Sequence, residues 1–397
     1  MSQRDDAVRP IPQRAGGQPA GTADDRGDDV YTVDVRGRRR GGRPGGRESA
    51  PPPPARPAGP HDEGGGPRRP RRRGRTVVGI VLLLVLAWVA FMVYTPLHAW
   101  QTVAKVDSTP SGTRPADSRG FNYLLVGSDS REGLTAGQRK EYHTGKDAGR
   151  RTDSIILVHV PQDGGKPVLV SIPRDSYVPI PGHRSNKINA SFSFGGPNLL
   201  VKTVEHVSDI HIDGYVEIGF AGFASVVDSV DGVRICVPFH MNDPKAGINL
   251  KKGCQVLDGK NALGYVRARY SDPRGDIGRA ERQRQFLGAI MKKALMPSTV
   301  LVPTRYWAFS HAAAKGLIVG DDTSLRDATR VLQALRAVSK DQGLSLVVPI
   351  QDLNYQTQAG SSVKWDTARA KALFTDLRED KPLETAPAGT DGKPSGG

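Results

Sequence analysis

The sequence predicts a layered α/β domain behind one membrane-spanning helix. Helix-like and strand-like patterns alternate through about 250 residues of the carboxy-terminal part, as in folds that stack helices on a sheet. An uncharged apolar stretch precedes that part, and six of the eight residues from Arg68 to Arg75, immediately before the stretch, are arginine. The 397-residue chain is therefore expected to consist of a charged leader, an apolar span and a folded domain.

The apolar stretch is long enough to cross a bilayer. Residues 76–94 would form a helix of about 28 Å, close to the thickness of a hydrocarbon core. Arginine-rich flanks stay on the cytoplasmic side, and the first charges after the stretch are Lys105 and Asp107. A cleaved signal peptide would have a much shorter leader than the 75 residues present here. We therefore expect a signal anchor in the cell membrane, single-pass type II, with the folded domain extracellular.

The formal net charge of +15 does not by itself indicate a nucleic-acid partner. Residues 1–75 hold 17 arginines, no lysine and 10 acidic residues, so this segment supplies about half of the excess. The segment is rich in Gly and Pro and has few large apolar residues, so burial cannot offset the entropy of ordering it. We expect a disordered cytoplasmic tail and no nucleic-acid partner.

Composition and periodicity divide the remainder. We expect an extracellular stalk at 95–118, a folded domain with a carboxy-terminal extension at 119–380, and a disordered tail at 381–397. Strands are predicted at 123–126, 155–160, 167–172 and 344–349, and a hairpin at 226–230 and 233–238 around Asp231-Gly232. Helices are predicted at 197–210, 276–295, 324–338 and 366–377.

The two cysteines, Cys236 and Cys254, both follow the apolar stretch. A bridge between them is expected in an oxidising exterior and would contribute about 3 kcal/mol in the chain-entropy model. The chain has no CxxC and no HExxH motif, which argues against a zinc site. Two buried free thiols are the remaining alternative.

Acidic and basic residues stand together at the ends of three predicted strands. One isolated Asp would be assigned to a turn or a cap, but here three aspartates each have arginine beside them. The pairs are Asp129 with Arg131, Asp153 with Arg151, and Asp175 with Arg174. Carboxylates suit Mg²⁺, and guanidinium groups suit phosphate oxygens. The pattern predicts a magnesium-assisted phosphate site.

The helix predicted from Asp276 adds to this site. Its apolar face, traced backwards in steps of three and four, arrives at Gln283 and Arg279 near its first turns, where anions are favoured. Arg282 and Arg284 lie on other faces and are assigned in part to surface solvation. Arg267 and Arg269 are two residues apart, so in an extended segment they would point the same way.

Apolar residues at 216–226 either form core or line a slot for a lipid chain, and the sequence does not separate these alternatives. Nucleotide-binding and esterase signatures are absent: the chain has no GxxxxGK[ST], no convincing GxGxxG and no GxSxG.

The order of these segments resembles the LytR-CpsA-Psr (LCP) family. The resemblance rests on NYLLVGSDSR at 122–131, RTDS at 151–154, SIPRDS at 171–176, KINA at 187–190, IDGY at 212–215, LDG at 257–259, RAR at 267–269 and GDIGRAERQ at 275–283. Each motif alone is weak, but this many in the correct order behind one signal anchor are specific. Segment 354–357 and the helix after Trp365 also resemble the carboxy-terminal part of actinobacterial members.

The resemblance implies an αβα sandwich with a central mixed sheet, and roles for individual residues. Asp129 and Asp153 resemble the aspartates that hold Mg²⁺, and together with Arg151 and Arg279 they are the expected catalytic residues. The residues expected to bind the substrate are Arg131, Arg174, Arg267, Arg269 and Gln283. Asp175 and Asp276 are candidate general bases. A hydrophobic pocket should hold the prenyl tail.

The implied activity is transfer of a glycopolymer from polyprenyl pyrophosphate to peptidoglycan. Attack of a muramic-acid 6-hydroxyl would form a phosphodiester and release polyprenyl phosphate, at the cytoplasmic membrane's outer side. One alternative is a non-catalytic polyprenyl-pyrophosphate binder or a pyrophosphatase that uses the same pocket. A membrane-bound transcriptional regulator is a further alternative, against which the expected topology and the lack of an evident helix-turn-helix both argue.

Overall fold

A computed structural model describes residues 72–129, 135–142, 152–268, 271–272 and 275–394. The first described element, α1 (Arg72–Trp100), includes an apolar helix of 27 residues from Gly74 to Trp100 that is long enough to cross a membrane. The helix is longer than the expected span of 76–94 because it continues through Pro96. A proline cannot donate the usual bond to the carbonyl four residues earlier, here that of Met92. The Tyr306 hydroxyl donates to that oxygen instead, at 3.1 Å.

Residues 95–118 do not form the expected stalk. After α1 ends at Trp100, β1 (Ala104–Val106) pairs in parallel with β12 (Leu317–Gly320) at one edge of the main sheet. Arg114 then forms a 2.6 Å ion pair with the nearly buried Glu205 and donates to the carbonyl of Ile212. The segment is therefore attached to the domain, by β1, by Arg114 and by further hydrogen bonds from Lys105 and Thr109.

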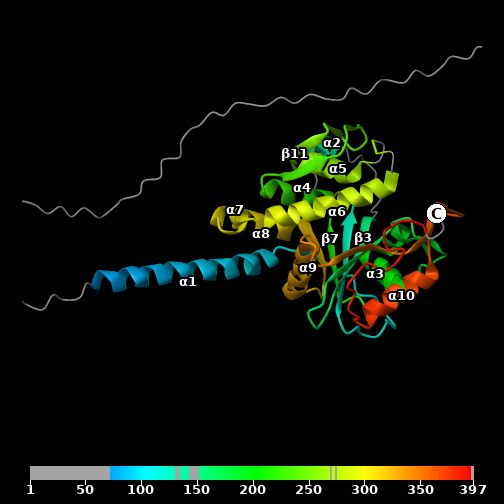
Figure 1. The fold of residues 1–397 in the computed structure, drawn as a ribbon, viewed down its shortest axis with the longest axis horizontal. Coiled ribbons are helices and arrows are strands. Elements are labelled where there is room, and N and C mark those ends of the chain that lie inside the picture. Colours follow the sequence, from blue (N-terminus) through cyan, green and yellow to red (C-terminus); the bar gives the residue numbers. More distant parts are fainter. Residues whose placement is uncertain (1–71, 130–134, 143–151, 269–270, 273–274, 395–397) are drawn as a thin grey trace, which may run out of the picture. The chain divides into compact units, whose positions relative to one another are not determined.

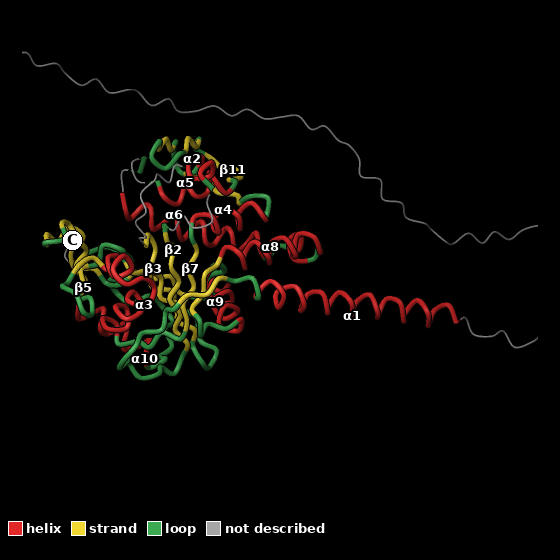
Figure 2. Tube along the Cα trace, turned by 180° about the vertical axis from the view of Figure 1, so that it is seen from behind, coloured by secondary structure: helices red, strands yellow, loops and turns green. Residues whose placement is uncertain are grey.

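A mixed seven-stranded sheet organises the domain (Figures 1 and 2). The strand order is β1-β12-β7-β2-β3-β4-β13. Besides β1 and β12, the sheet contains β2 (Phe121–Ser128), β3 (Thr152–Val160), β4 (Val168–Ile172), β7 (Gly214–Ile218) and β13 (Leu344–Val347). Strand β3 is antiparallel to both β2 and β4. The end of β2, the start of β3 and the end of β4 therefore lie side by side, at the same end of these three strands.

Alternate residues of these strands bury into two separate cores, as the two-residue period of a strand requires. Leu124, Leu157 and Val170 face α3 (Ile188–Ser208) and α10 (Thr367–Arg378). Tyr123, Val158 and Leu169 face α6 (Gly275–Ala294) and α9 (Leu325–Val338). The result is the expected αβα sandwich.

A second cluster of elements lies against α6. It contains α2 (Ala136–Glu141), α4 (Phe220–Ser229), β8 (Val233–Val237), β9 (Met241–Asp243), β10 (Ile248–Leu250), β11 (Gly253–Leu257) and α5 (Gly259–Arg267). Cys236 and Cys254 are opposite one another in the β8–β11 pair and form the expected disulfide. The hairpin expected around Asp231-Gly232 is wrong, because residues 226–230 belong to the end of α4.

Two further helices, α7 (Pro297–Val300) and α8 (Pro303–Gly316), follow α6. Helix α8 packs closely on α4, where a Cβ placed on Gly222 would stand 2.1 Å from the carbonyl oxygen of Gly316. Only glycine permits this approach, and it fixes α8 against the domain.

Residues 381–394 are not a detached tail. Two small strand pairs stand outside the main sheet: β5–β6 (Tyr177–Val178 and Asn186–Lys187) and the β14–β15 hairpin (Ile350–Thr357 and Gly360–Trp365). After α10, the chain returns to the main sheet. The Val347 amide donates to the Thr390 carbonyl at 2.8 Å, and Pro394 forms a bridge with Ile350. The expectation of disorder from 381 is therefore wrong for the described part of this segment.

Most predicted elements are confirmed within a few residues. The three strands near the expected site became β2, β3 and β4, and the strand predicted at 344–349 became β13. Ser324 caps α9 and Asp366 caps α10, as expected of residues that accept from free amides at a helix start. Helix α3 starts nine residues before the predicted Pro197, with non-helical residues at Gly195 and Gly196.

Candidate active site at the strand ends

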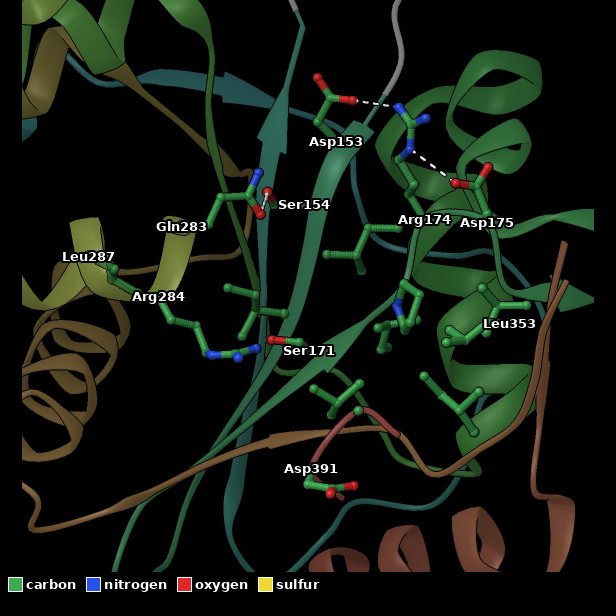
Figure 3. Close-up of a pocket in the computed structure, with 18 residues that line it drawn as sticks. Asp153, Ser154, Ser171, Arg174, Asp175, Gln283, Arg284, Leu287, Leu353 and Asp391 are labelled. Atoms are coloured by element: carbon green, nitrogen blue, oxygen red, sulfur yellow. Dashed lines mark hydrogen bonds and ion pairs between the residues drawn. The ribbon is translucent and has the colours of Figure 1, made fainter. Parts of the chain in front are cut away.

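Charged side chains meet where β3 begins and β4 ends. Arg174 lies two residues after the end of β4 and donates through Nη1 to the Asp153 carboxylate at 2.7 Å. Its Nε donates to Asp175 at 3.2 Å, and Lys187 contacts the other oxygen of Asp175 at 3.0 Å. Figure 3 shows Arg174 between the two carboxylates. The sequence-predicted residues Asp153, Arg174 and Asp175 are thus brought together.

A β-bulge in β3 changes the direction of the Asp153 side chain. Gly127 pairs with Ser154, but the next residue of β2, Ser128, pairs with Thr152, so Asp153 is the extra residue of a β-bulge. Bulges redirect side chains and are frequent beside active sites. Asp129 directly follows Ser128, which places the two expected metal ligands at the same point of the β2–β3 pair.

A buried carboxylate, that of Glu217, binds the end of β2 next to Asp129. The fully buried Glu217 of β7 accepts from the Ser128 hydroxyl at 2.5 Å and from the Tyr215 hydroxyl at 2.7 Å. Glu217 is not among the residues predicted from the sequence. The available signal was a charged residue inside an otherwise apolar strand, because such residues are rarely fully buried without partners.

Helix α6 contributes Gln283, as the helical periodicity predicted. Its Oε1 accepts from the Ser154 hydroxyl at 2.8 Å, and its Nε2 donates to the Val266 carbonyl at 3.5 Å. Gln283 therefore connects the start of β3 to the end of α5. Ser154, which Figure 3 shows beside Gln283, is a site residue that the predictions omitted.

A pocket of about 150 Å³ opens between these charged groups and an apolar wall. Asp153, Arg174 and Asp175 form its polar end, and Ile155, Ile172 and Leu353 are among the apolar residues of its wall. A second pocket of about 330 Å³ lies between the sheet and helices α6 and α9. Both pockets share Ile156, Ser171, Arg284 and Leu287, which makes them neighbours. Asp391 and Gly392, from the segment expected to be disordered, also line the first pocket.

Arg284 and Arg282 both depart from the expected surface role. Arg284 lines both pockets, and burial lowers the pKa of its guanidinium despite the opposing effect of Glu281. Arg282 is 2% exposed, pairs with the buried Asp272, and donates to the Tyr265 carbonyl at 3.2 Å. A Cβ on Gly278 would overlap Asp272, so this glycine permits the first turns of α6 to approach that carboxylate. The partial assignment of the two arginines to surface solvation is therefore wrong.

Arg267 lies in a helix rather than in the extended segment assumed from the sequence. It is the last residue of α5, donates to the Tyr142 carbonyl at 3.0 Å, and stacks 4.6 Å above the Phe220 ring. Its neighbour Val266 is the residue that binds Gln283, so Arg267 is adjacent in sequence to a site contact. Phe220 and Val216 are buried, which favours the core interpretation of this apolar stretch.

The electrostatics of Asp175 argue against its use as a general base. Burial raises its pKa, but the Arg174 charge and the hydrogen bond from Lys187 outweigh that effect, and the net pKa is lowered. A carboxylate with a lowered pKa accepts a proton less readily. Asp175 is better suited to hold Arg174 in place.

Several expected residues lie outside the described part of the chain. Arg131, Arg151 and Arg269 are among them, and for Arg279 and Asp276 the structure describes the α6 backbone but not the side chain. Their assigned roles stay predictions.

The donor set is compatible with Mg²⁺ only if the substrate completes it. The described residues contain no group of three or more His, Cys, Asp or Glu side chains arranged to hold a metal ion. Mg²⁺ is often bound by one or two carboxylates together with substrate phosphates and water, however. Asp129 and Asp153, at one point of the β2–β3 pair, match that pattern.

The structure thus combines an αβα sandwich with strand-end carboxylates and a pocket that has a charged end and an apolar wall. Residues 93–378 match the model of the LytR_cpsA_psr family. The chain belongs to this family.

Relatives of the chain are named for cell wall biosynthesis and teichoic acid transfer. It is 41% identical over 283 residues to the probable cell wall biosynthesis protein LcpB of Corynebacterium glutamicum, covering 71% of this chain and 66% of LcpB, just under two thirds. It is 34% identical over 240 residues to TagU of Oceanobacillus iheyensis, a polyisoprenyl-teichoic acid–peptidoglycan teichoic acid transferase, covering 56% of this chain and 69% of TagU. A solved structure of TagT bound to LI-WTA is 27% identical with a TM-score of 0.50, covering 71% of this chain and all of that chain.

Proposed function

We propose that this protein is a membrane-anchored phosphotransferase that moves a glycopolymer from a polyprenyl pyrophosphate carrier to peptidoglycan. The observation that carries the proposal is the pocket at the strand ends, where Asp153, Arg174 and Asp175 meet an apolar wall. A pyrophosphate joined to a prenyl chain has the same two parts, one anionic and one apolar. The transferase name of TagU supports the same activity class.

Arg174 would bind the pyrophosphate. In the structure its guanidinium group spans two carboxylates, 2.7 Å from Asp153 and 3.2 Å from Asp175. A substrate phosphate could replace Asp153 on Nη1, because a guanidinium group binds phosphate oxygens as readily as carboxylate oxygens. Asp175 would keep its hold on Nε during this exchange, aided by Lys187.

Asp153, released from Arg174, would join Asp129 in holding Mg²⁺. A bound Mg²⁺ would neutralise charge on the phosphate oxygens. Gln283 and Ser154 would position the sugar-linked phosphate. Arg284, Leu287 and Ile156 would line the path of the prenyl chain towards the second pocket.

In the proposed reaction, the oxygen of a muramic-acid 6-hydroxyl attacks the phosphorus that carries the glycan. The bond from this phosphorus to the bridging oxygen breaks, and polyprenyl phosphate leaves with that electron pair. The hydroxyl proton passes to a base other than Asp175, whose lowered pKa makes it a poor acceptor. Positioning and charge neutralisation would supply most of the rate, as in other phosphoryl transfers.

The test is a product analysis with purified full-length protein, lipid-linked glycan and peptidoglycan fragments. The expected products are a glycan–muramic acid phosphodiester and polyprenyl phosphate, detected by mass spectrometry. Release of free glycan phosphate without any phosphodiester would instead indicate a pyrophosphatase. Binding of the lipid without any new product would indicate a carrier-binding protein.

The membrane topology needs a separate test. A reporter that is active only in the cytoplasm should work when fused at residue 40 and fail at the carboxy terminus, because arginine-rich flanks remain inside. The reverse pattern would contradict both the anchor orientation and the extracellular site.

A further inference from the structure

The hairpin of α7 and α8 exposes a cluster of large apolar side chains. Outside α1, eight large hydrophobic residues of the described chain are exposed, and four of these lie within residues 296–307. They are Met296 (42% exposed), Leu301 (61%), Val302 (40%) and Trp307 (36%). Clustered apolar exposure of this kind marks a contact with another surface.

Helix α8 lies parallel to the final turns of α1. Phe91 contacts the rings of Tyr306 and Trp307, and seven residues later His98 contacts Trp307 and His311. The chain therefore runs in the same direction in both helices. The hydrogen bond from Tyr306 to the Met92 carbonyl, which Pro96 leaves without its helical donor, fixes their relative height.

This relative height places the α7–α8 turn at the depth of the bilayer. Counted from Thr76, about 20 residues cross the hydrocarbon core and end near Thr95, so Met92 lies about 5 Å inside the outer boundary. Pro303, the first residue of α8, precedes Tyr306 by three residues, which is roughly 5 Å further towards the membrane centre, and Leu301 lies in the turn before it. An exposed leucine at that depth meets lipid chains rather than water.

The charges around the hairpin agree with a membrane surface. No acidic residue occurs from Arg282 to Gly320, whereas Lys292, Lys293, Arg305 and Lys315 do occur there. Arg305 lies two residues after Pro303, at the start of α8, and its exposed side chain forms an ion pair with Asp231 at 3.2 Å. Basic residues beside exposed apolar and aromatic ones are typical of segments that lie in the interface of a bilayer containing anionic lipid.

We propose that the α7–α8 turn, residues 296–307, inserts into the outer leaflet of the membrane and forms a second membrane contact beside α1. The proposal rests on the membrane-anchor part of the proposed function but not on the transfer reaction. With two contacts, the domain is held at one height and one rotation above the bilayer. A single helix would leave it free to swivel.

Fluorescence quenching in lipid tests this contact on the full-length protein. Both native cysteines are in the disulfide, so one introduced cysteine gives a single labelling site. We would label Leu301→Cys with a fluorophore and reconstitute it in vesicles containing nitroxide-labelled lipid. Phe194→Cys on α3, which is also more than half exposed, is the matched control, and Leu84→Cys inside α1 is the reference for a membrane position.

The expected result is quenching at Leu301 about twofold or more above that at Phe194, strongest with nitroxides on the acyl chains, because Leu301 would lie below the headgroups of the outer leaflet. Quenching at Leu84 with none at Leu301 would overturn this inference while leaving the anchor intact. No quenching at Leu84 would overturn the anchor and the second contact with it. An unquenched Leu301→Cys protein that cross-links to a second copy would assign the patch to a dimer and would also overturn the inference.

Discussion

Two arginine–aspartate pairs of this domain have the same chemistry and very different surroundings. Arg282 and Asp272 are 2% and 0% exposed in their side chains, and Arg282 also donates to backbone carbonyls. Arg174 and Asp153 are 18% and 29% exposed and line a pocket. The buried pair is enclosed by protein, whereas the pocket pair faces space that a ligand can enter.

The difference shows which pair is suited to function. A buried ion pair loses much free energy when one partner is removed, because the other charge remains in a poorly solvated place. A partly exposed pair contributes little to stability, since water screens both charges. Arg174 can therefore exchange its carboxylate for a phosphate, and Arg282 can hold the first turns of α6 in place.

Removing the buried guanidinium should have the largest effect. Arg282→Met is expected to lower the free energy of unfolding by about 3–5 kcal/mol, because Asp272 loses this partner inside the protein. Urea unfolding of the full-length protein in detergent measures the change. Arg336→Met, at an exposed position of α9, is the control and should stay within about 0.5 kcal/mol. Equal stability of the two variants would remove the distinction between the two pairs.

Asp153→Ala should affect transfer rather than stability. We expect a loss of transfer of about 10²–10³-fold, because a group that stabilises charge in the reaction is removed. The residual activity should no longer respond to Mg²⁺, while the free energy of unfolding changes by less than about 1 kcal/mol. A magnesium titration after chelation measures this response. The control is Asp163→Ala, in the exposed turn between β3 and β4; an unaltered magnesium response in Asp153→Ala would exclude Asp153 as a ligand.

Arg174→Ala should weaken binding of the pyrophosphate lipid by about 10- to 150-fold, the range for losing a charge-assisted contact. Arg174→Lys should not restore full affinity, because an ammonium group cannot contact two acceptors in the planar arrangement of a guanidinium group. Equilibrium binding to lipid in detergent micelles measures both. Lys166→Ala removes an exposed ion pair with Glu384 and should bind like the native protein. Native affinity in Arg174→Ala would show that the exposed pair is structural.

A third pair, His159 with Asp380, extends the comparison to a buried pair whose contribution to stability depends on pH. Burial lowers the pKa of His159 in spite of Asp380, which lies 3.1 Å from Nε2. The folded state then binds a proton less readily than the unfolded state, whose histidine titrates near pH 6.5. Stability is complete above about pH 6.5 and decreases as the pH falls towards the lowered pKa, by at most about 1.4 kcal/mol per pH unit.

His159→Gln should remove this part of the pH dependence. Urea unfolding at about pH 7.5 and about pH 5.5 measures it, with His240→Gln at an exposed position as the control. If both variants keep the native difference between the two conditions, the buried histidine does not titrate as inferred.

Short-range patterns predicted much of this molecule. The three strands that carry Asp129, Asp153 and Arg174 are short apolar runs bounded by turn residues, and their pairing brought the charges to one sheet edge. Gln283 was found by stepping along one helix face. These inferences depend on periods of two and about 3.6 residues, which the sequence displays directly.

The failures depend on contacts between segments. The β-branched residues at 226–230 favoured a strand, but α4 extends to Ser229, and the same helix packs on α8 where Gly222 approaches Gly316. The pairing of Arg282 with Asp272 depends on how the chain reaches α6. Helix α5 was missed although its start had a local signal, since Asp258 accepts from the Asn261 amide at 2.8 Å as an N-cap.

The return of residues 386–394 to the sheet has a consequence for how copies of the protein coexist on a crowded surface. Strand β13 is the last strand of the sheet, and an uncovered last strand is a template on which another chain can add. The Thr390 carbonyl accepts the hydrogen bond from the Val347 amide. Pro394, which bridges to Ile350, has no amide hydrogen that could pair with a further strand. The segment that was expected from its composition to be disordered thus covers part of this edge and limits edge-to-edge pairing there.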